Sequence, residues 1–122
     1  MADKPFRFGP TALTTTLTTN ILKGPVQAAA GVGIVAQDIY MLIRHIRIVN
    51  KTAAAATFSL WLGATGANAA GTEVIGLGLS VPANSAFDWY GYLRMDAADY
   101  LVGGAGTTLA LTIEGEGTLA VV

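Results

Sequence analysis

Residues 39–50 read Ile-Tyr-Met-Leu-Ile-Arg-His-Ile-Arg-Ile-Val-Asn, and this stretch decides the fold of the chain. In its second half, Ile46 and Ile48 lie on one side of an extended chain, and His45 and Arg47 lie on the other. Alternation with a period of two residues is typical of a strand with one buried face. We therefore predict a β-strand with both isoleucines in a core. His45 faces outward in this interpretation, so its replacement by Ala is expected to be nearly silent.

The first half of the same stretch, residues 39–43, is apolar on both faces, with Ile39 and Met41 on one of them. Strands that are covered on both faces read as continuous apolar runs. We expect this half to be covered on both sides, by the N-terminal segment or by another subunit. Arg44 falls on the face assigned to the core, and either a β-bulge or a buried partner would accommodate it.

Shorter stretches with the same alternation lie on both sides of residues 39–50. Turn signals separate them at intervals of roughly 8–12 residues, which is the pattern of a sandwich or barrel. We predict an all-β fold, an antiparallel β-sandwich or jelly-roll-like barrel of seven to nine short strands. The further strands are expected at residues 11–23, 33–36, 56–62, 73–81, 87–94, 100–102, 108–113 and 118–122. Turns are expected at residues 24–25, 63–72, 82–85, 96–99, 103–106 and 115–117.

The first twelve residues differ from the rest of the chain. We predict an extended N-terminal arm over residues 1–12 and a single β-sandwich domain over residues 13–122. Two prolines and a glycine close together argue against a regular element in the arm. Phe6 and Phe8 carry large apolar side chains, so the arm should pack on its own sandwich, on a sister subunit or on a larger assembly. Our hypothesis is that the arm reaches out and fastens the subunit to its partner. Arg7 could pair there with an acidic neighbour.

Composition excludes several classes of protein. The chain has 122 residues, 12% of them charged, and a formal net charge of -1. This charge cannot supply the basic patch that nucleic-acid binding needs. The chain has no cysteine, so a disulfide framework or a thiolate metal site is excluded. The sequence predicts no signal peptide and no membrane-spanning segment, and we expect synthesis in the cytoplasm and no membrane contact. Because a typical domain is about 25% charged, we expect neighbours to cover much of the surface.

Motifs that would carry catalysis or metal binding are weak. His45 is the only histidine, and none of the three serines lies in a nucleophile elbow. The stretch at residues 31–36 matches G-x-G-x-x-A but lacks the preceding strand and following helix of a dinucleotide site. Asp96 and Asp99 are too sparse for a calcium loop and predict a turn held by side-chain bonds to the backbone. We therefore predict no enzyme activity, no cofactor and no metal site.

Aromatic side chains are the remaining candidates for binding. On outward faces they could stack on sugars or could anchor a protein interface. The candidates are Trp61, Trp89, Tyr90, Tyr92 and Tyr100. In so weakly charged a chain we favour the interface, because Trp and Tyr are frequent anchors there. The predicted partner and assembly contacts are Phe6, Arg7, Phe8, Ile39, Met41, Trp61, Trp89 and Tyr90.

Several motifs recur in an order that is typical of one family. They are Ile-x-Ile-x-Asn at residues 46–50, a small-residue turn at 51–56, an alternating strand at 57–62, Val-Pro-Ala-Asn-Ser at 81–85 and Asp-Tyr-Leu at 99–101. In this order the chain resembles small virion proteins of tailed bacteriophages. Such proteins include head decoration proteins and components of the neck, tail and fibres. Ala98 stands where the family usually has Gly, so the turn there is expected to differ.

The resemblance implies a structural protein of the virion. The expected function is capsid decoration, in which an oligomer, as a first guess a trimer, binds the outer face of the phage head. The expected partners are other copies of the chain and the major capsid protein or other virion proteins. A role at the neck, tail or fibres, and a glycan-binding adsorption module, stay open as alternatives.

Overall fold

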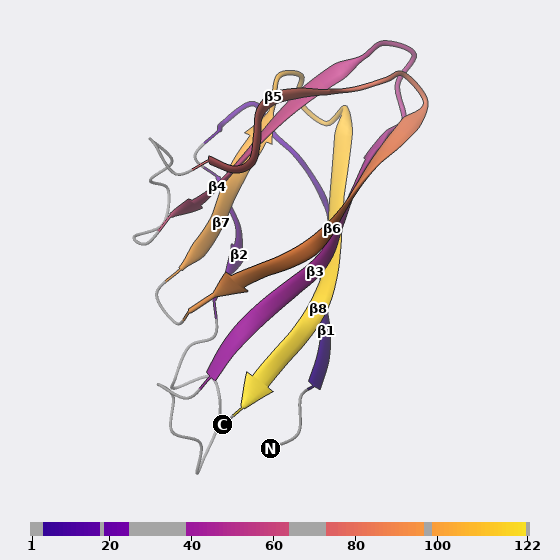
Figure 1. Cartoon of the computed structure of the whole chain (residues 1–122). Helices are drawn as coiled ribbons and strands as arrows, with labels where there is room; N and C mark the ends of the chain where they lie inside the picture. The colour runs from indigo at the N-terminus through magenta and orange to yellow at the C-terminus, as the bar shows by residue number, and fades with distance from the viewer. Residues whose placement is uncertain (1–3, 18, 25–38, 64–72, 97–98, 122) are drawn as a thin grey trace.

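The computed structural model describes residues 4–17, 19–24, 39–63, 73–96 and 99–121, in which eight strands form two antiparallel sheets packed face to face (Figure 1). This confirms the predicted all-β sandwich. Within these residues no helix is long and apolar enough to cross a membrane. The strand expected at residues 33–36 lies outside them. The strands are β1 (Lys4–Ala12), β2 (Asn20–Lys23), β3 (Ile39–Asn50), β4 (Ala56–Gly63), β5 (Glu73–Val81), β6 (Ser85–Met95), β7 (Tyr100–Ala105) and β8 (Leu111–Val121).

The strand pairing is nested. The first sheet has the order β1-β8-β3-β6 and the second has the order β2-β7-β4-β5. The pairs are therefore β1 with β8, β2 with β7, β3 with β6 and β4 with β5. The chain turns back on itself between β4 and β5, and each earlier strand pairs with its later counterpart. As a result, β1 and β8 lie side by side although they are farthest apart in the sequence (Figure 1).

The core lies between the two sheets. Ile46 and Ile48 of β3 have no exposed surface, which confirms the alternation predicted for this strand. Phe58 and Leu60 face them from β4, as the alternation of that strand predicts. The other fully buried apolar side chains of this core are Ile43, Val81, Met95, Leu101, Leu111 and Ile113.

A β-bulge resolves the conflict at Arg44. Ile43 and His45 of β3 each pair with a residue of β8 and with a residue of β6. From one pairing to the other, β8 spans two residues (116–117), β3 three (43–45) and β6 four (90–93). The extra residue in β3 switches the side chains from one alternation to the other. Ile43 therefore lies in the core and Arg44 is exposed. Of the two explanations that the sequence leaves open, the bulge is the one the chain uses.

The N-terminal residues form a regular strand, so the expectation that they would be irregular is wrong. β1 is an edge strand, where a proline without an N–H donor is tolerated. Its pairing with β8 shifts between Phe8 and Thr11, where Gly9 adopts a positive φ of 75°. Phe8 is 7% exposed and belongs to the core, and Phe6 packs against that core. Both rings therefore dock on the sandwich of their own chain, so the hypothesis that they reach out to a partner is wrong.

The single strand predicted over residues 11–23 is also wrong, because β1 ends at Ala12 and β2 begins at Asn20. Threonine hydroxyls in this segment bond the local backbone. The Thr16 N–H donates to Thr14 Oγ1 at 3.3 Å, and Thr19 Oγ1 donates to the Thr16 carbonyl at 2.7 Å. Local bonds of this kind compete with strand pairing. The segment instead carries the chain from the first sheet to the second.

Glycines that were expected to make turns lie inside strands. β7 runs on through Gly103, and β8 is one strand through Gly117 where two strands were predicted. A Cβ at Gly103 would clash with the Ser59 carbonyl oxygen, and one at Gly117 would clash with the Leu42 carbonyl oxygen. The predicted turns are wrong because these glycines permit close approach of the backbones.

Asn50 organises the turn after β3. Its side chain is buried, and Nδ2 donates to the carbonyl oxygens of Ala54 at 2.8 Å and Val81 at 3.0 Å. Its Oδ1 accepts from the Thr52 N–H at 2.9 Å and the Thr52 hydroxyl at 2.7 Å. The Asn84 N–H in the predicted turn between β5 and β6 donates to the Thr52 carbonyl at 2.9 Å. Three of the motifs behind the family resemblance, at residues 46–50, 51–56 and 81–85, therefore meet in space.

The acidic turn between β6 and β7 has the predicted side-chain bond. The Asp96 N–H donates to Asp99 Oδ2 at 2.9 Å, and the Asp99 N–H donates to the Asp96 carbonyl at 3.0 Å. Arg94 also donates to Asp96 Oδ1 at 2.8 Å. The two carboxylates thus hold the turn and the neighbouring arginine.

Candidate functional site

Charged residues are concentrated in one of the two sheets. The strands of the first sheet contain eight of the chain's fifteen charged residues, whereas those of the second contain two, Lys23 and Glu73. The first sheet also holds the single histidine and every arginine of the chain. Its charged residues are Lys4, Arg7, Arg44, Arg47, Asp88, Arg94, Glu114 and Glu116.

One row of polar side chains crosses the outer face of this sheet. Arg7 of β1 pairs with Glu116 of β8, and Glu116 pairs with His45 of β3. His45 in turn pairs with Tyr90 of β6. Because directly opposed residues of neighbouring strands point to the same face, the four side chains lie in line across the sheet. The row follows the bulge, since His45 is the first residue after Arg44.

His45 has two well-defined neighbours. Its Nε2 lies 2.8 Å from Asp88 Oδ1, and Arg47 Nη1 donates to the same oxygen at 3.3 Å. The imidazole also stacks on the ring of Tyr90, with centroids 4.6 Å apart and an interplanar angle of 12°. The outward direction predicted for His45 is confirmed, but the side chain is only 22% exposed. Its contacts fix the ring in one orientation.

The pair of His45 and Asp88 resembles part of a hydrolase triad. Such a triad also needs a hydroxyl within hydrogen-bond reach of the imidazole. Among the described residues, Asp88 is the only side chain that hydrogen-bonds His45. The pair therefore positions the imidazole beside Tyr90, and within the described part of the chain the geometry gives no nucleophile for it to activate.

Tyr92 and Arg44 form a second pair beside that of Tyr90 and His45. Arg44 Nη2 donates to Tyr92 Oη at 3.3 Å, and the guanidinium carbon lies 5.1 Å from the centre of the ring. Tyr90 and Tyr92 are 73% and 71% exposed. Two large rings on the surface are thus each held by a neighbour on β3.

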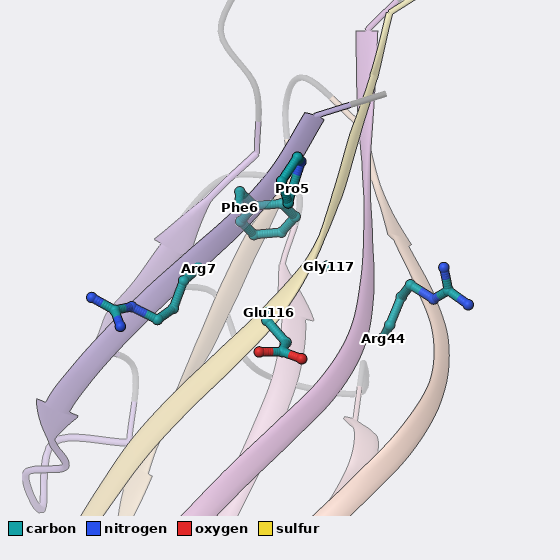
Figure 2. A pocket seen from close by; sticks show the side chains of 6 residues that line it. All are labelled: Pro5, Phe6, Arg7, Arg44, Glu116 and Gly117. Atoms are coloured by element: carbon teal, nitrogen blue, oxygen red, sulfur yellow. The ribbon is translucent and has the colours of Figure 1, made fainter. Parts of the chain in front are cut away.

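Two shallow hollows flank the bulge. One has a volume of about 570 Å³ and lies between β1, β8 and the bulge (Figure 2). In Figure 2 Glu116 lies between Arg7 and Arg44, whose side chains point away to opposite sides. The other hollow, of about 560 Å³, shares Arg44 and Glu116 with the first. Its remaining lining residues are His45, Tyr90, Gly91 and Tyr92.

The predicted contact residues divide into two groups. Arg7 and Tyr90 lie exposed on the outer face of the first sheet, where partner contact stays a prediction. The side chain of Ile39 lies outside the described part of the structure. The others are buried or half-buried within the chain, which leaves little of their surface for a partner. These are Phe6, Phe8, Met41, Trp61 and Trp89.

The sequence did not single out Arg44, Asp88 or Glu116 as site residues, and it offered Tyr92 only as part of a possible aromatic platform for sugars. A signal was present at Arg44, whose position conflicted with the alternation of the strand. The same-face spacing of Tyr90 and Tyr92 was a second signal. The pairings of His45 depend on the bulge and have no signature in the sequence.

No protein-family description and no curated protein sequence matches the chain. Among solved structures, Tobacco streak virus coat protein aligns with 98% of this chain and 85% of its own, at 11% identity and a TM-score of 0.41. A chain of the infectious bursal disease virus Gx strain aligns with 98% of this chain and 30% of its own, at 9% identity and a TM-score of 0.45. A pentameric capsid protein from metagenomic phage sequences aligns with 98% of this chain and 62% of its own, at 14% identity and a TM-score of 0.30. TM-scores below 0.5 are too low to carry function over to this chain.

Proposed function

We propose that the chain is a non-enzymatic structural protein of a virion, and specifically a decoration protein that binds the outer face of a phage head as an oligomer. The nested pairing of β1 with β8, β2 with β7, β3 with β6 and β4 with β5 is the observation that carries this proposal. That pairing is expected of an eight-stranded jelly roll, a double-sheet arrangement used by viral capsid domains and lectins. Architecture alone does not define function, so two further observations support the choice.

The first is the sequence resemblance to tailed-phage virion proteins. Its motifs are structural, and Asn50 shows what one of them does, since it bonds both its own turn and the Val81 carbonyl. A chain that preserves such turns keeps the ends of its two sheets together. This is the kind of constraint that a structural subunit needs.

The second is the charge-poor second sheet. Its outer face exposes Thr57 and Ser80, and its edge strand β5 leaves Val74 and Leu79 38% and 37% exposed. Interface cores are depleted in charged residues relative to the rest of a protein surface. This sheet is therefore the surface proposed to face other copies of the chain or the shell. The trimer is the first oligomer to test.

Copy number separates decoration from the other virion roles. The labelled full chain would be added to intact virions of the virus that encodes it and imaged, and its copies per particle would be counted. Decoration predicts label over the whole head at hundreds of copies. A handful of copies at one vertex or on the tail would replace decoration by a neck, tail or fibre role. Absence from the virion would overturn the proposal.

A further inference from the structure

Tyr90 and Tyr92 form a prepared aromatic surface. One face of the Tyr90 ring lies against the His45 imidazole, and Arg44 lies over the Tyr92 ring. These contacts set the directions of both rings, yet more than two thirds of each residue is exposed. Preorganised rings lose little conformational freedom when a ligand binds to them.

Polar groups with unused hydrogen-bonding capacity surround the two rings. Within the described residues Glu116 makes no hydrogen bond or salt bridge, so both of its oxygens can accept. Arg44 uses one N–H towards Tyr92 and keeps others to donate. Asp88, in contrast, is already engaged by His45 and Arg47. The hollow thus offers one free acceptor group and one free donor group beside the rings.

The charges of the hollow identify the class of ligand. Arg44 and Glu116 balance each other, which disfavours a phosphate or another strong anion as the ligand. None of the six lining residues is aliphatic. A sugar ring has one face of C–H groups for an aromatic ring and a rim of hydroxyls that both donate and accept. The volume of about 560 Å³ lies within the range of small-ligand sites.

We infer that the hollow between the bulge and the two tyrosines binds a neutral sugar unit of a glycan. The sugar stacks on Tyr90 and Tyr92, while Glu116 accepts hydrogen bonds from its hydroxyls and Arg44 donates to them. This inference does not depend on where in a virion the protein resides. It adds a ligand to the charged sheet, whereas the proposed function concerns the second sheet.

The test is a two-dimensional NMR titration of the labelled full chain. The probes are the methyl glycosides of glucose, galactose, mannose and N-acetylglucosamine, each to about 10 mM, which is tenfold above a Kd of about 1 mM. We expect at least one glycoside to shift the resonances of residues 44–45, 90–92 and 116. Tyr90→Ala and Tyr92→Ala should each weaken that binding about tenfold. Tyr92→Phe keeps the ring and should bind nearly as well as the natural chain.

Val49→Ala is the matched control, because Val49 lies outside the hollow on the outer face of the same sheet; its binding should be unchanged. No shift with any glycoside would overturn the inference. Shifts with inorganic phosphate or sialic acid alone would replace the neutral sugar by an anion. Loss of self-association in Tyr90→Ala, without any sugar effect, would replace it by a second copy of the chain. Virion binding is a separate measurement, so failure of the proposed function would leave this result intact.

Discussion

The two sheets share one core and differ in what they present outside. On β3 of the first sheet, the exposed Arg47 and Val49 alternate with the buried Ile46 and Ile48. On β4 of the second sheet, the four residues Phe58, Ser59, Leu60 and Trp61 are all buried. A period of two in the sequence identifies the inward face in both strands. The same alternation predicts an exposed outer face correctly only for the first sheet, where charged side chains occupy that face. In β4 the outward Ser59 and Trp61 are buried.

The largest expected effect is at the centre of β3. Ile48→Asp should abolish folding, because burying an unpaired carboxylate costs several kcal/mol and a whole domain is stable by only about 5–15 kcal/mol. Val49→Asp, one residue further along, places the same carboxylate on the solvent-exposed face. It should lower the free energy of unfolding by about 1 kcal/mol or less. Circular dichroism with urea unfolding measures both variants. Equal damage from the two would show that the outer face of β3 is covered.

The same pair of positions on β4 should behave differently. Leu60 points into the core, and Trp61 points outward but is only 5% exposed, packed with Val102 and Tyr100. Leu60→Ala should cost about 2–5 kcal/mol and Trp61→Ala about 3–5 kcal/mol. Urea unfolding measures both free energies. A Trp61→Ala variant as stable as the natural chain would contradict the covered outer face of β4.

The N-terminal strand supplies the next effect. Phe8→Ala should cost about 3–5 kcal/mol, because the ring is 7% exposed in the core. Gly115→Ala should also destabilise the chain, since its Cβ would occupy the position of the Phe8 ring. Arg7→Ala, on the exposed face between the two phenylalanines, is the control and should stay within about 0.5 kcal/mol. Thermal melts of the three variants test this order. A Phe8→Ala variant with an unchanged melting temperature would show that β1 does not pack on the core.

The smallest effect is at the polar row. From the sequence alone, His45→Ala is expected to leave the free energy of unfolding nearly unchanged. Because His45 hydrogen-bonds Asp88, we now expect the substitution to lower that free energy by about 1 kcal/mol. Asp96→Ala is the comparison, because its partner Arg94 is largely exposed and surface pairs of this kind contribute about 0–1 kcal/mol. Urea unfolding of both variants gives the order. A silent His45→Ala would show that the imidazole is held only loosely.

The strands that the sequence predicts well are those with regular alternation. β3 has the predicted bounds, because its Ile-rich face contrasts with charged residues on the other face. β1 was missed because proline and glycine usually interrupt strands, and an edge position tolerates them. The glycines of β7 and β8 were misread because a glycine in a turn and one at a close backbone contact look alike in a sequence. The site depends on the bulge at Arg44, which aligns residues of four strands that no sequence spacing connects.

The central claim is that the charge-poor second sheet is the assembly surface and the charged first sheet stays exposed. Sedimentation velocity of the full chain at micromolar concentration tests it with two variants. Ser80→Arg places a charge on the exposed outer face of the second sheet, and Val49→Arg places the same charge on the first. The account predicts an oligomer, a trimer first, for the natural chain and for Val49→Arg, and a folded monomer for Ser80→Arg. A monomeric natural chain, or dissociation of Val49→Arg alone, would contradict it.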